Sequence, residues 1–283
     1  EELEVRANAA RVVGDSVMTE GQSALLKLLQ DPSSRVVSLS AIALGRVAPK
    51  GDQNVVNALF AVAKLNQGKS FEPTIRHSLL SALDRVAADD QLSSFAKSKD
   101  VEQRLLCVLL LRRRASPELA QFLEDQEDAV REEAILAIYD TDAMDGPAGQ
   151  KLLSVDPEGL PFYHQARLVG ACFRMGTIDS AVQLGQFVSD TGLDKQIRAF
   201  ALHALMRWSV PLDADPVLGH YRPCTASKVG LTEVVSKIGA DLTPLLEKEK
   251  DPKLASLLAA FAQKSGLSID LATLRKQVSD PKL

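Results

Sequence analysis

The sequence predicts an all-α fold built from repeated helix pairs, and three observations lead to this prediction. Leu and Ala account for 42 and 35 of the 283 residues, whereas the chain holds only 9 Phe, 3 Tyr and 1 Trp. This composition suits closely packed helices better than a β-sandwich, which needs more β-branched and aromatic residues. No stretch of six residues alternates convincingly between apolar and polar positions, as a half-buried strand would. A motif with an acidic residue and an arginine four positions later recurs along the chain.

The most complete copy of this motif spans residues 31–44, with the sequence DPSSRVVSLSAIAL. Asp31 opens the copy, Pro32 follows, Arg35 comes four residues after the aspartate, and Ala41 comes six residues after the arginine. Successive motif arginines are separated by 29, 41, 28, 27, 36 and 31 residues, which defines the repeat length, and a degenerate last copy opens at Asp251. The motif arginines are Arg6, Arg35, Arg76, Arg104, Arg131, Arg167 and Arg198.

Each position of the motif has a physical role at the start of a helix. The acidic residue accepts hydrogen bonds from free N–H groups of the first turn and interacts favourably with the helix dipole. Proline suits the first helical position, where no N–H donor is needed. The arginine either pairs with the acid four residues earlier along the helix or reaches the next repeat. Small residues three or six positions after the arginine, such as Gly170 and Ala82, let an adjacent helix approach closely.

A shorter amphipathic helix is expected between successive motif helices. Within 54–64, for example, Val55, Leu59 and Val62 recur at steps of three or four residues, which places them on one helix face. The shorter helices are expected at 23–30, 54–64, 92–97, 118–124, 149–154 and 179–189. Each helix pair then forms one repeat, and stacked repeats share a continuous apolar core.

The repeat rhythm breaks after Trp208. Residues 209–223 contain three prolines and two aspartates, which disfavours a helix and predicts an ordered connection over 209–227. Trp208 and Tyr221 are expected to anchor this connection with their apolar rings. Helices are expected again at 228–239, 242–250, 252–264 and 271–278, and the end of the chain, 279–283, is expected to fray. We therefore divide the chain into a repeat array (1–208), the proline-rich connection (209–227), and a C-terminal cap or further helical repeats (228–283).

Two-helix units that open with D-P-x-x-R-V, as at 31–36, resemble HEAT-like repeats. The resemblance covers about residues 1–210. It implies a right-handed α-solenoid, an armadillo-like scaffold with an extended face for protein–protein interaction.

The run RAFALHALMRWSVP at 198–211, followed by DPVLGHYRP at 215–223, carries a second and more specific resemblance. It is similar to the end of the HEAT-repeat region in a group of large extracytoplasmic bacterial proteins. Those proteins also carry a sugar-dehydrogenase-like β-propeller and a c-type cytochrome domain. The resemblance implies that this chain is a connector in a periplasmic or otherwise extracytoplasmic redox protein. The chain has neither the propeller nor a C-x-x-C-H haem motif, so no redox role passes to any of its residues.

The net charge and the hydropathy of the chain limit the classes of molecule that it is expected to bind. The net charge is −4, from 33 basic and 37 acidic side chains, so the sequence lacks the basic excess that nucleic-acid binding needs. The longest apolar stretches fall short of the about 20 residues that span a bilayer, and we expect no membrane insertion. The chain starts with Glu1 and Glu2 instead of a methionine or a basic signal segment. We interpret it as an excised domain or mature fragment, which leaves localisation open.

Three clusters are candidates for a site, and each also has a structural interpretation. The run DTDAMDG at 140–146 resembles a calcium loop, but its spacing departs from the EF-hand pattern, so a turn whose acids cap the next helix is favoured. Residues 112–114 are three arginines that close a helix, where cations favour the dipole; docking of an acidic partner is the alternative. His220, Tyr221 and Arg222 form a polar cluster, for which stapling of the loop is favoured over ligand binding.

The sequence predicts no catalytic residue, no cofactor and no metal site. His77 and His203 are interpreted as ordinary residues of the repeat helices, and none of the four histidines, which also include His164 and His220, belongs to a convincing set of metal ligands. The three cysteines form no C-x-x-C pair and are interpreted as two buried free thiols and one loop thiol. The candidate interaction or structural loop consists of Trp208, Asp215, His220, Tyr221 and Arg222.

The leading functional hypothesis is a non-catalytic scaffold or protein-interaction solenoid. Its partners would be other proteins or neighbouring domains of the same longer chain. The alternative is an accessory docking domain of a secreted haem- and propeller-containing oxidoreductase, which rests on the resemblance at 198–223. A third hypothesis is an enzyme of the lyase type that is sometimes attached to HEAT-like repeats. We expect no enzymatic activity in this chain, whereas the resemblance implies an oxidoreductase for the longer parent protein.

Overall fold

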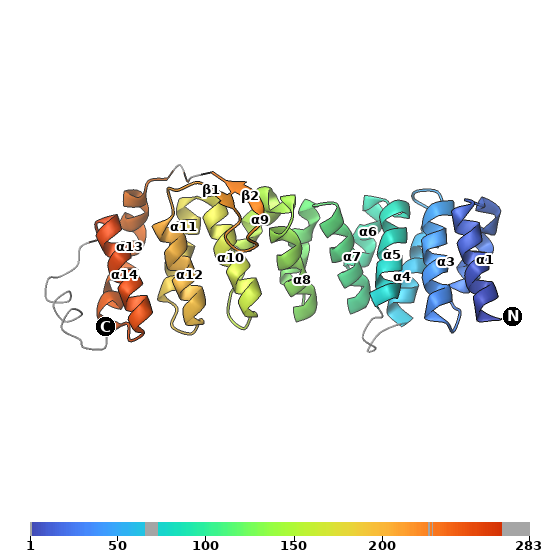
Figure 1. The fold of residues 1–283 in the computed structure, drawn as a ribbon, viewed down its shortest axis with the longest axis horizontal. Helices are drawn as coiled ribbons and strands as arrows, with labels where there is room; N and C mark the ends of the chain where they lie inside the picture. Colours follow the sequence, from blue (N-terminus) through green and yellow to red (C-terminus); the bar gives the residue numbers. More distant parts are fainter. Residues whose placement is uncertain (1, 66–72, 226, 228, 268–283) are drawn as a thin grey trace. The chain divides into compact units, whose positions relative to one another are not determined.

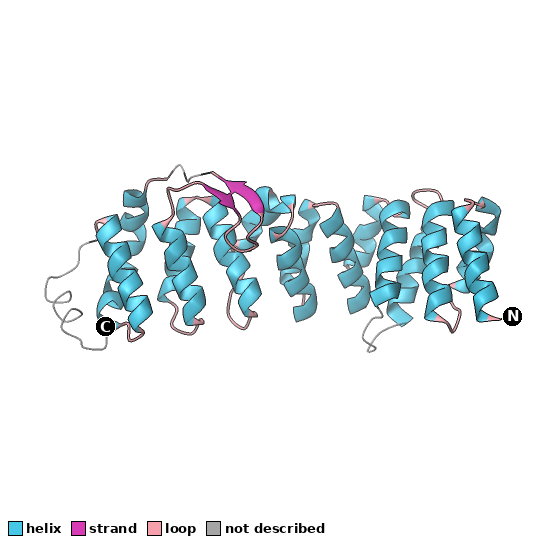
Figure 2. Ribbon diagram, viewed as in Figure 1, coloured by secondary structure: helices cyan, strands magenta, loops and turns pink. Residues whose placement is uncertain are grey.

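The computed structural model describes residues 2–65, 73–225, 227 and 229–267. Over these residues the chain forms fourteen α-helices, three short 3₁₀ helices and one two-stranded antiparallel sheet (Figure 2). The all-α prediction is confirmed, because successive helices pack against one another as repeated pairs. The chain divides into two compact units, Glu1–Ala137 and Ile138–Leu283, and each unit is a stack of such pairs.

The first unit consists of long motif helices with shorter helices between them. Its elements are α1 (Leu3–Asp15), η1 (Thr19–Gly21), α2 (Gln22–Leu28), α3 (Ser34–Val47), α4 (Gln53–Leu65), α5 (Pro73–Val86), α6 (Asp89–Ala96), α7 (Val101–Arg113), η2 (Pro117–Glu124) and α8 (Asp128–Tyr139), which ends in the second unit. Helices α1, α3 and α5 pack side by side in one layer, while α2 packs against α3 and α4 against α5 (Figure 1). Helix α7 continues the stack through contacts with α4, α5 and α6.

The long helices approach closely because glycine and alanine occupy their contact points. A Cβ atom added to Gly14 would lie 2.8 Å from the Cβ of Ala43, and one added to Gly45 would lie 2.6 Å from the Cα of Ala82. Carbon atoms normally stay about 3.5–4.0 Å apart, so larger side chains would push the helices away from each other. The abundance of small residues in the sequence therefore follows from the spacing of the helices.

Two motif arginines of the first unit reach acids of the neighbouring repeat. Arg6 forms two hydrogen bonds with Asp31, the acid that opens the next copy of the motif, with N–O distances of 2.6 and 3.1 Å. Arg104 binds Asp125 in the same way at 2.7 and 2.9 Å, and both side chains are 8% exposed. Each of these carboxylates also accepts the backbone N–H two residues later. Each pair therefore joins two repeats and shapes the turn before the next helix.

The other motif arginines of this unit are more exposed. Arg35 pairs with Glu4 of α1 at 3.0 Å, and more than half of each side chain is exposed. Arg131 pairs with Asp128 in the first turn of its own helix. Arg76 lies on the exposed face of α5. Pairing between repeats thus occurs, whereas the pair along a helix joins Arg131 to an acid three residues earlier instead of the predicted four.

The second unit repeats this organisation and adds a β-hairpin. Its elements are η3 (Asp142–Asp145), α9 (Pro147–Leu152), α10 (Phe162–Met175), α11 (Ile178–Ser189), α12 (Lys195–Met206), β1 (Leu212–Ala214), β2 (Tyr221–Cys224), α13 (Leu231–Lys248) and α14 (Pro252–Ser265). Helices α10, α12 and α14 pack in one layer, and α11 packs against α13 in the other (Figure 1). Arg198 of α12 bonds to Glu249, just after α13, at 2.6 Å, and both side chains are nearly buried.

The segment predicted as a short α-helix at 118–124 is a 3₁₀ helix instead. It begins with Ser116 as the N-cap and Pro117 in the first turn. Leu119 and Phe122 are three residues apart and are both buried. Because a 3₁₀ helix has three residues per turn, this spacing places both side chains on one face.

The two helices expected at 228–239 and 242–250 form the single helix α13, with Pro244 in its interior. Proline removes one backbone hydrogen bond and costs about 3 kcal/mol inside a helix. Leu242 and Leu246, on either side of the proline, are buried, and burying each stabilises the helix by about 1.5–3 kcal/mol. Packing therefore offsets the cost of the proline. The segments expected at 271–278 and 279–283 lie outside the described residues.

We expect Gly45→Ala to lower the free energy of unfolding by about 1–3 kcal/mol, although alanine is the better helix former. The reason is the overlap of the new methyl group with the backbone of Ala82. Ser93→Ala, at an exposed position of α6, is the control and should change stability by less than about 0.5 kcal/mol. Urea unfolding of both variants measures the difference. An unchanged or higher stability of Gly45→Ala would contradict the packing argument.

We expect the contribution of Asp125 to stability to disappear in acid. Burial alone would raise the pKa of this carboxyl group, but the hydrogen bonds from Arg104 and from a backbone N–H outweigh it and hold the pKa below the ordinary value of 3.8. A lowered pKa means that the carboxylate stabilises the fold above about pH 4 and that this contribution is lost as the pH falls through the folded-state pKa.

Asp125→Asn should therefore cost about 3 kcal/mol at pH 7, and its deficit relative to the parent should shrink as the pH is lowered from 5 to 3. Urea unfolding at a series of pH values measures both quantities. Asp128→Asn, which removes a carboxylate whose side chain is 78% exposed, should cost at most about 1 kcal/mol. A deficit of Asp125→Asn that is the same at pH 3 and pH 7 would show that the ion pair is not its cause.

Candidate functional site

The proline-rich connection forms a β-hairpin that lies on the second unit. Strands β1 and β2 pair antiparallel, with Leu212 opposite Cys224 and Ala214 opposite Tyr221. The turn between them is closed by two backbone hydrogen bonds of 2.9 Å, from Asp215 N–H to the carbonyl of His220 and from the N–H of Gly219 to the carbonyl of Asp215. The strands are three and four residues long, too short for the alternating pattern that identifies a strand in a sequence.

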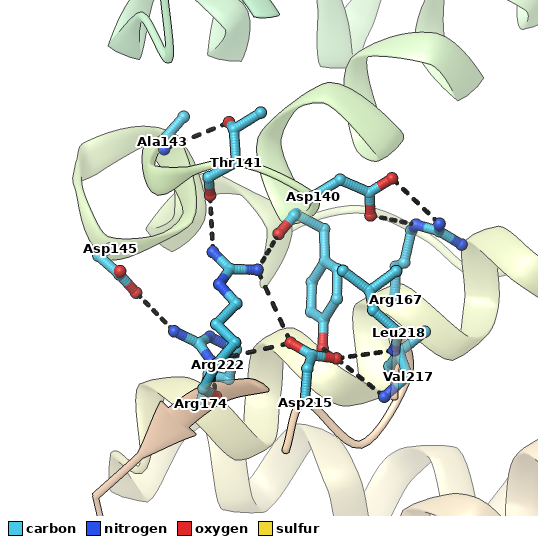
Figure 3. Close-up of polar contacts among 11 residues, drawn as sticks. Asp140, Thr141, Ala143, Asp145, Arg167, Arg174, Asp215, Val217, Leu218 and Arg222 are labelled. Carbon is cyan, nitrogen blue, oxygen red and sulfur yellow. Dashed lines mark hydrogen bonds and ion pairs between the residues drawn. The ribbon is translucent and has the colours of Figure 1, made fainter. Parts of the chain in front are cut away.

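The buried carboxylate of Asp215 holds the hairpin in place. One oxygen of its carboxylate accepts hydrogen bonds from the Tyr139 hydroxyl and from the backbone N–H groups of Val217 and Leu218, each at 2.9 Å (Figure 3). The side chain of Asp215 has no exposed surface. A buried carboxylate is stable only when it is hydrogen-bonded and its charge is compensated. The hydrogen bonds of Oδ1 meet the first of these two requirements.

Two arginines compensate the charge of Asp215. Its second oxygen lies 3.8 Å from Nη1 of Arg174 and 3.7 Å from Nη1 of Arg222, and both guanidinium groups are largely buried. Arg222 also donates to the carbonyl oxygens of Tyr139 and Thr141, at 2.5 and 2.7 Å. The carbonyl of Tyr139 lies at the C-terminal end of α8, where a cation interacts favourably with the helix dipole. The hairpin is thus bound to the end of α8 and to α10.

Tyr139 completes this cluster, and its position requires a glycine on α10. A Cβ atom added to Gly170 would lie 2.3 Å from the Tyr139 hydroxyl oxygen and 2.6 Å from a methyl carbon of Val217. Burial and the neighbouring Asp215 carboxylate raise the pKa of Tyr139, so the hydroxyl stays protonated and donates its hydrogen bond. The guanidinium carbon of Arg222 lies 5.8 Å from the centre of the tyrosine ring.

The acids of the 140–146 run bind arginines, which corrects the prediction that they cap the next helix. Asp140 accepts two hydrogen bonds from the motif arginine Arg167, at 2.8 and 3.1 Å, and Asp145 accepts one from Arg174 at 3.1 Å (Figure 3). The cap of η3 is instead the hydroxyl of Thr141. Two of the three carboxylates considered for calcium are thus bound to guanidinium groups. Within the described ranges, no three or more His, Cys, Asp or Glu side chains are grouped to hold a metal ion.

Of the five loop residues singled out in the sequence, Asp215 and Arg222 are the pair whose side chains the structure brings together. Trp208 is buried apart from them, and its ring N–H donates to the carbonyl of Val229 at 3.0 Å. His220 is exposed, and Tyr221 is 79% exposed. The expectation that Tyr221 anchors the connection is therefore wrong. Along β2 the exposed positions alternate with less exposed ones, so Arg222 and Cys224 face the helices while Tyr221 faces away.

Among the residues that hold the hairpin, Tyr139 and Arg174 were not predicted from the sequence, and Thr141 and Asp145 were assigned to a separate candidate cluster at 140–146. A signal for part of this set was present. Asp140 and Arg167 are 27 residues apart, and Asp145 and Arg174 are 29 apart. Both separations are close to one repeat, so acids and arginines at that distance are candidates for pairing between neighbouring helices.

The other clusters considered in the sequence are engaged inside the fold. Arg112 bonds to Glu133, and Arg114 pairs with Asp89 and donates to two backbone carbonyls, whereas Arg113 between them is exposed as predicted for a helix end. All three cysteines are free and buried, including the one expected in a loop. Burial raises the pKa of the Cys172 thiol to about 12, so it is protonated and unreactive at neutral pH.

A cavity of about 430 Å³ lies beside the hairpin, between α10, α12 and β1. Phe173, Phe200 and Ala204 contribute apolar surface from the helices, and His203, Arg207 and Asp213 are among the polar residues that line it. An apolar pocket with a few polar groups is the usual form of a site that receives a ligand or a side chain of a partner.

Comparison with solved structures gives 38 matching chains, which include the following two. YibA from Escherichia coli is 13% identical, with a TM-score of 0.43, over 92% of this chain and 86% of YibA. An engineered protein is 16% identical, with a TM-score of 0.42, over 96% of this chain and 75% of the engineered chain. No family model and no curated protein matches the sequence. At these scores the fold assignment rests on the helix pairs of the chain itself. None of the helices in the described part has the length and hydropathy to cross a membrane.

We expect Asp215→Ala to lower the free energy of unfolding of the second unit by about 3–5 kcal/mol, because it removes the buried counter-charge of Arg222 and one of the two carboxylates that Arg174 faces. The amides of Val217 and Leu218, which bond to this carboxylate, should exchange with solvent at least tenfold faster. Hydrogen exchange measures both effects. Asp213→Ala, two residues earlier and exposed, is the matched control and should cost less than about 0.5 kcal/mol. Equal effects of the two variants would contradict the role assigned to Asp215.

Proposed function

We propose that this chain is a non-catalytic scaffold of the α-solenoid type that binds a protein partner through the outer face of its β-hairpin. The partner is a separate protein or a neighbouring domain of the same longer chain. The observation that carries the proposal is the combination of a firmly fixed hairpin with an exposed aromatic side chain. Asp215 holds the hairpin on the side that faces the helices, and the side chain of Tyr221, which is 79% exposed, lies on the outer side.

A surface of this kind suits protein binding for two reasons. A loop that is already ordered loses little conformational entropy when a partner binds. Tyrosine is enriched at interfaces because its ring offers a large apolar area with a polar tip. Val210, just before the hairpin, adds a second exposed apolar side chain, with an exposure of 44%. The cavity beside β1 offers a recess for a side chain of the partner.

The scaffold is favoured over the other hypotheses because the charged groups of this region act within the fold. Asp215, Arg174 and Arg222 bind one another and the backbone, and Asp140 and Arg167 are paired. The structural matches and the hairpin geometry give no support to a docking role in a haem- and propeller-containing oxidoreductase.

We expect a photo-crosslinking amino acid in place of Tyr221 to capture one discrete protein in cells of the source organism. The same amino acid in place of Tyr163, which is 71% exposed, is the control. Tyr163 lies on α10 about 16 Å along the helix axis from Arg174, which contacts the hairpin. The two sites are therefore alike in exposure but differ in position.

The captured protein, once purified, should bind the unmodified chain in calorimetry, and Tyr221→Ala should weaken binding at least tenfold, which is about 1.4 kcal/mol. Tyr163→Ala should leave the affinity within twofold. Crosslinks of equal yield at both positions, or none at position 221, would contradict the proposed surface.

A further inference from the structure

A second cleft, of about 310 Å³, lies in the first unit across α1, α3 and α5. Its polar lining includes Asn8 and Arg11 from α1, Arg35 and Ser38 from α3, and Thr74 and Ser78 from α5. Every one of these side chains can donate a hydrogen bond. No acidic residue belongs to the lining, although the chain as a whole has a net charge of −4. The cleft is therefore a donor-rich, positively charged surface on an acidic protein.

The two arginines of the cleft are able to bind a ligand. Arg11 is exposed and forms no ion pair with any described carboxylate. Arg35 pairs with Glu4, but 59% of its side chain and 56% of that of Glu4 are exposed, so solvent screens the pair and it contributes little. A carboxylate from outside can therefore replace Glu4 without disturbing the core.

Ser38 gives an independent indication that the cleft receives a ligand. The residue is 4% exposed, and its hydroxyl group has no hydrogen-bond partner within the described part of the chain. A serine inside a helix commonly donates to the carbonyl four residues earlier. Ser78, in the same cleft, does so, with a distance of 2.8 Å to the carbonyl oxygen of Thr74. A buried hydroxyl without a partner is unfavourable, and a ligand in the cleft would supply the missing partner.

The arrangement of the donors indicates an elongated ligand. They are side chains that come from three different helices. Neighbouring helix axes lie about 8–10 Å apart, so a ligand that reaches all three spans about 16–20 Å. That length corresponds to about five or six residues of extended chain. Leu39 and Ile42 also line the cleft and suit the methylene groups of glutamate side chains.

We infer that this cleft binds an extended acidic segment of a partner protein, whose carboxylates pair with Arg11 and Arg35 and which accepts a hydrogen bond from Ser38. The site is in the other unit from the hairpin, so it is independent of the surface proposed above. It differs from a small-anion site, which would gather its donors around a single point.

Fluorescence anisotropy with the full 283-residue chain tests the inference, with fluorescein-labelled hexaglutamate as the probe and labelled hexaglutamine as its neutral counterpart. Hexaglutamate should bind saturably, and hexaglutamine at least tenfold more weakly. Arg11→Gln and Arg35→Gln should each weaken hexaglutamate binding at least fivefold. Arg85→Gln, at an exposed arginine of α5 outside the cleft lining, should change it less than twofold, as should Tyr221→Ala.

The two serines provide a control within the cleft itself. Ser38→Ala should weaken hexaglutamate binding at least threefold, whereas Ser78→Ala, whose hydroxyl is already bonded to the backbone, should leave it within twofold. Thermal unfolding followed by circular dichroism confirms that each variant is folded.

Four outcomes would overturn the inference. They are no saturable binding of hexaglutamate, equal binding of hexaglutamine, an equal loss of affinity in Arg85→Gln, and displacement of the peptide by an equimolar amount of inorganic phosphate. The last outcome would assign the cleft to a small anion instead of a peptide segment.

Discussion

The fold depends on bidentate pairs between an arginine on one helix and a carboxylate in the turn of a neighbouring repeat. Arg6–Asp31 and Arg104–Asp125 are the examples in the first unit, and Arg167–Asp140 is one in the second. Packing of leucine and alanine side chains holds neighbouring helices together. It does not determine which turn of one repeat lies beside which turn of the next. A planar guanidinium group that binds two carboxylate oxygens fixes both distance and orientation. In the first unit the arginine reaches an acid that follows it in sequence, and Arg167 reaches one that precedes it.

The hairpin uses the same chemistry for a different purpose. Asp215 is a carboxylate in a tight turn, as Asp31 and Asp125 are, but two arginines face it and a tyrosine hydroxyl bonds to it. Because all of these groups are buried, the hairpin gains a fixed position without a core of its own. Its outer side is then free to carry exposed residues such as Tyr221. The buried contacts of Asp215 thus stabilise the connection and also hold its outer side, with Tyr221, exposed to solvent.

The sequence predicted the repeated helix pairs and the motif arginines well, because both follow from local periodicity. It did not identify the partner of each arginine. Arg6 pairs with Asp31, which opens the next copy of the motif, and that pairing depends on how the helices stack. Tyr221 was predicted to anchor the connection, but it is exposed. A strand of four residues is too short to show in the sequence which of its faces is buried. The single helix through Pro244 depends on packing that no local rule contains.

A hairpin that Asp215 holds as a rigid surface should move as little as the helices that it contacts. Backbone ¹⁵N relaxation of the unbound protein tests this claim most directly, through the order parameters of the amides at 212–224. We expect values of about 0.85, equal to those of α10 and α12, on which the hairpin rests. Values below about 0.6 across the turn would show a flexible loop and would contradict the claim.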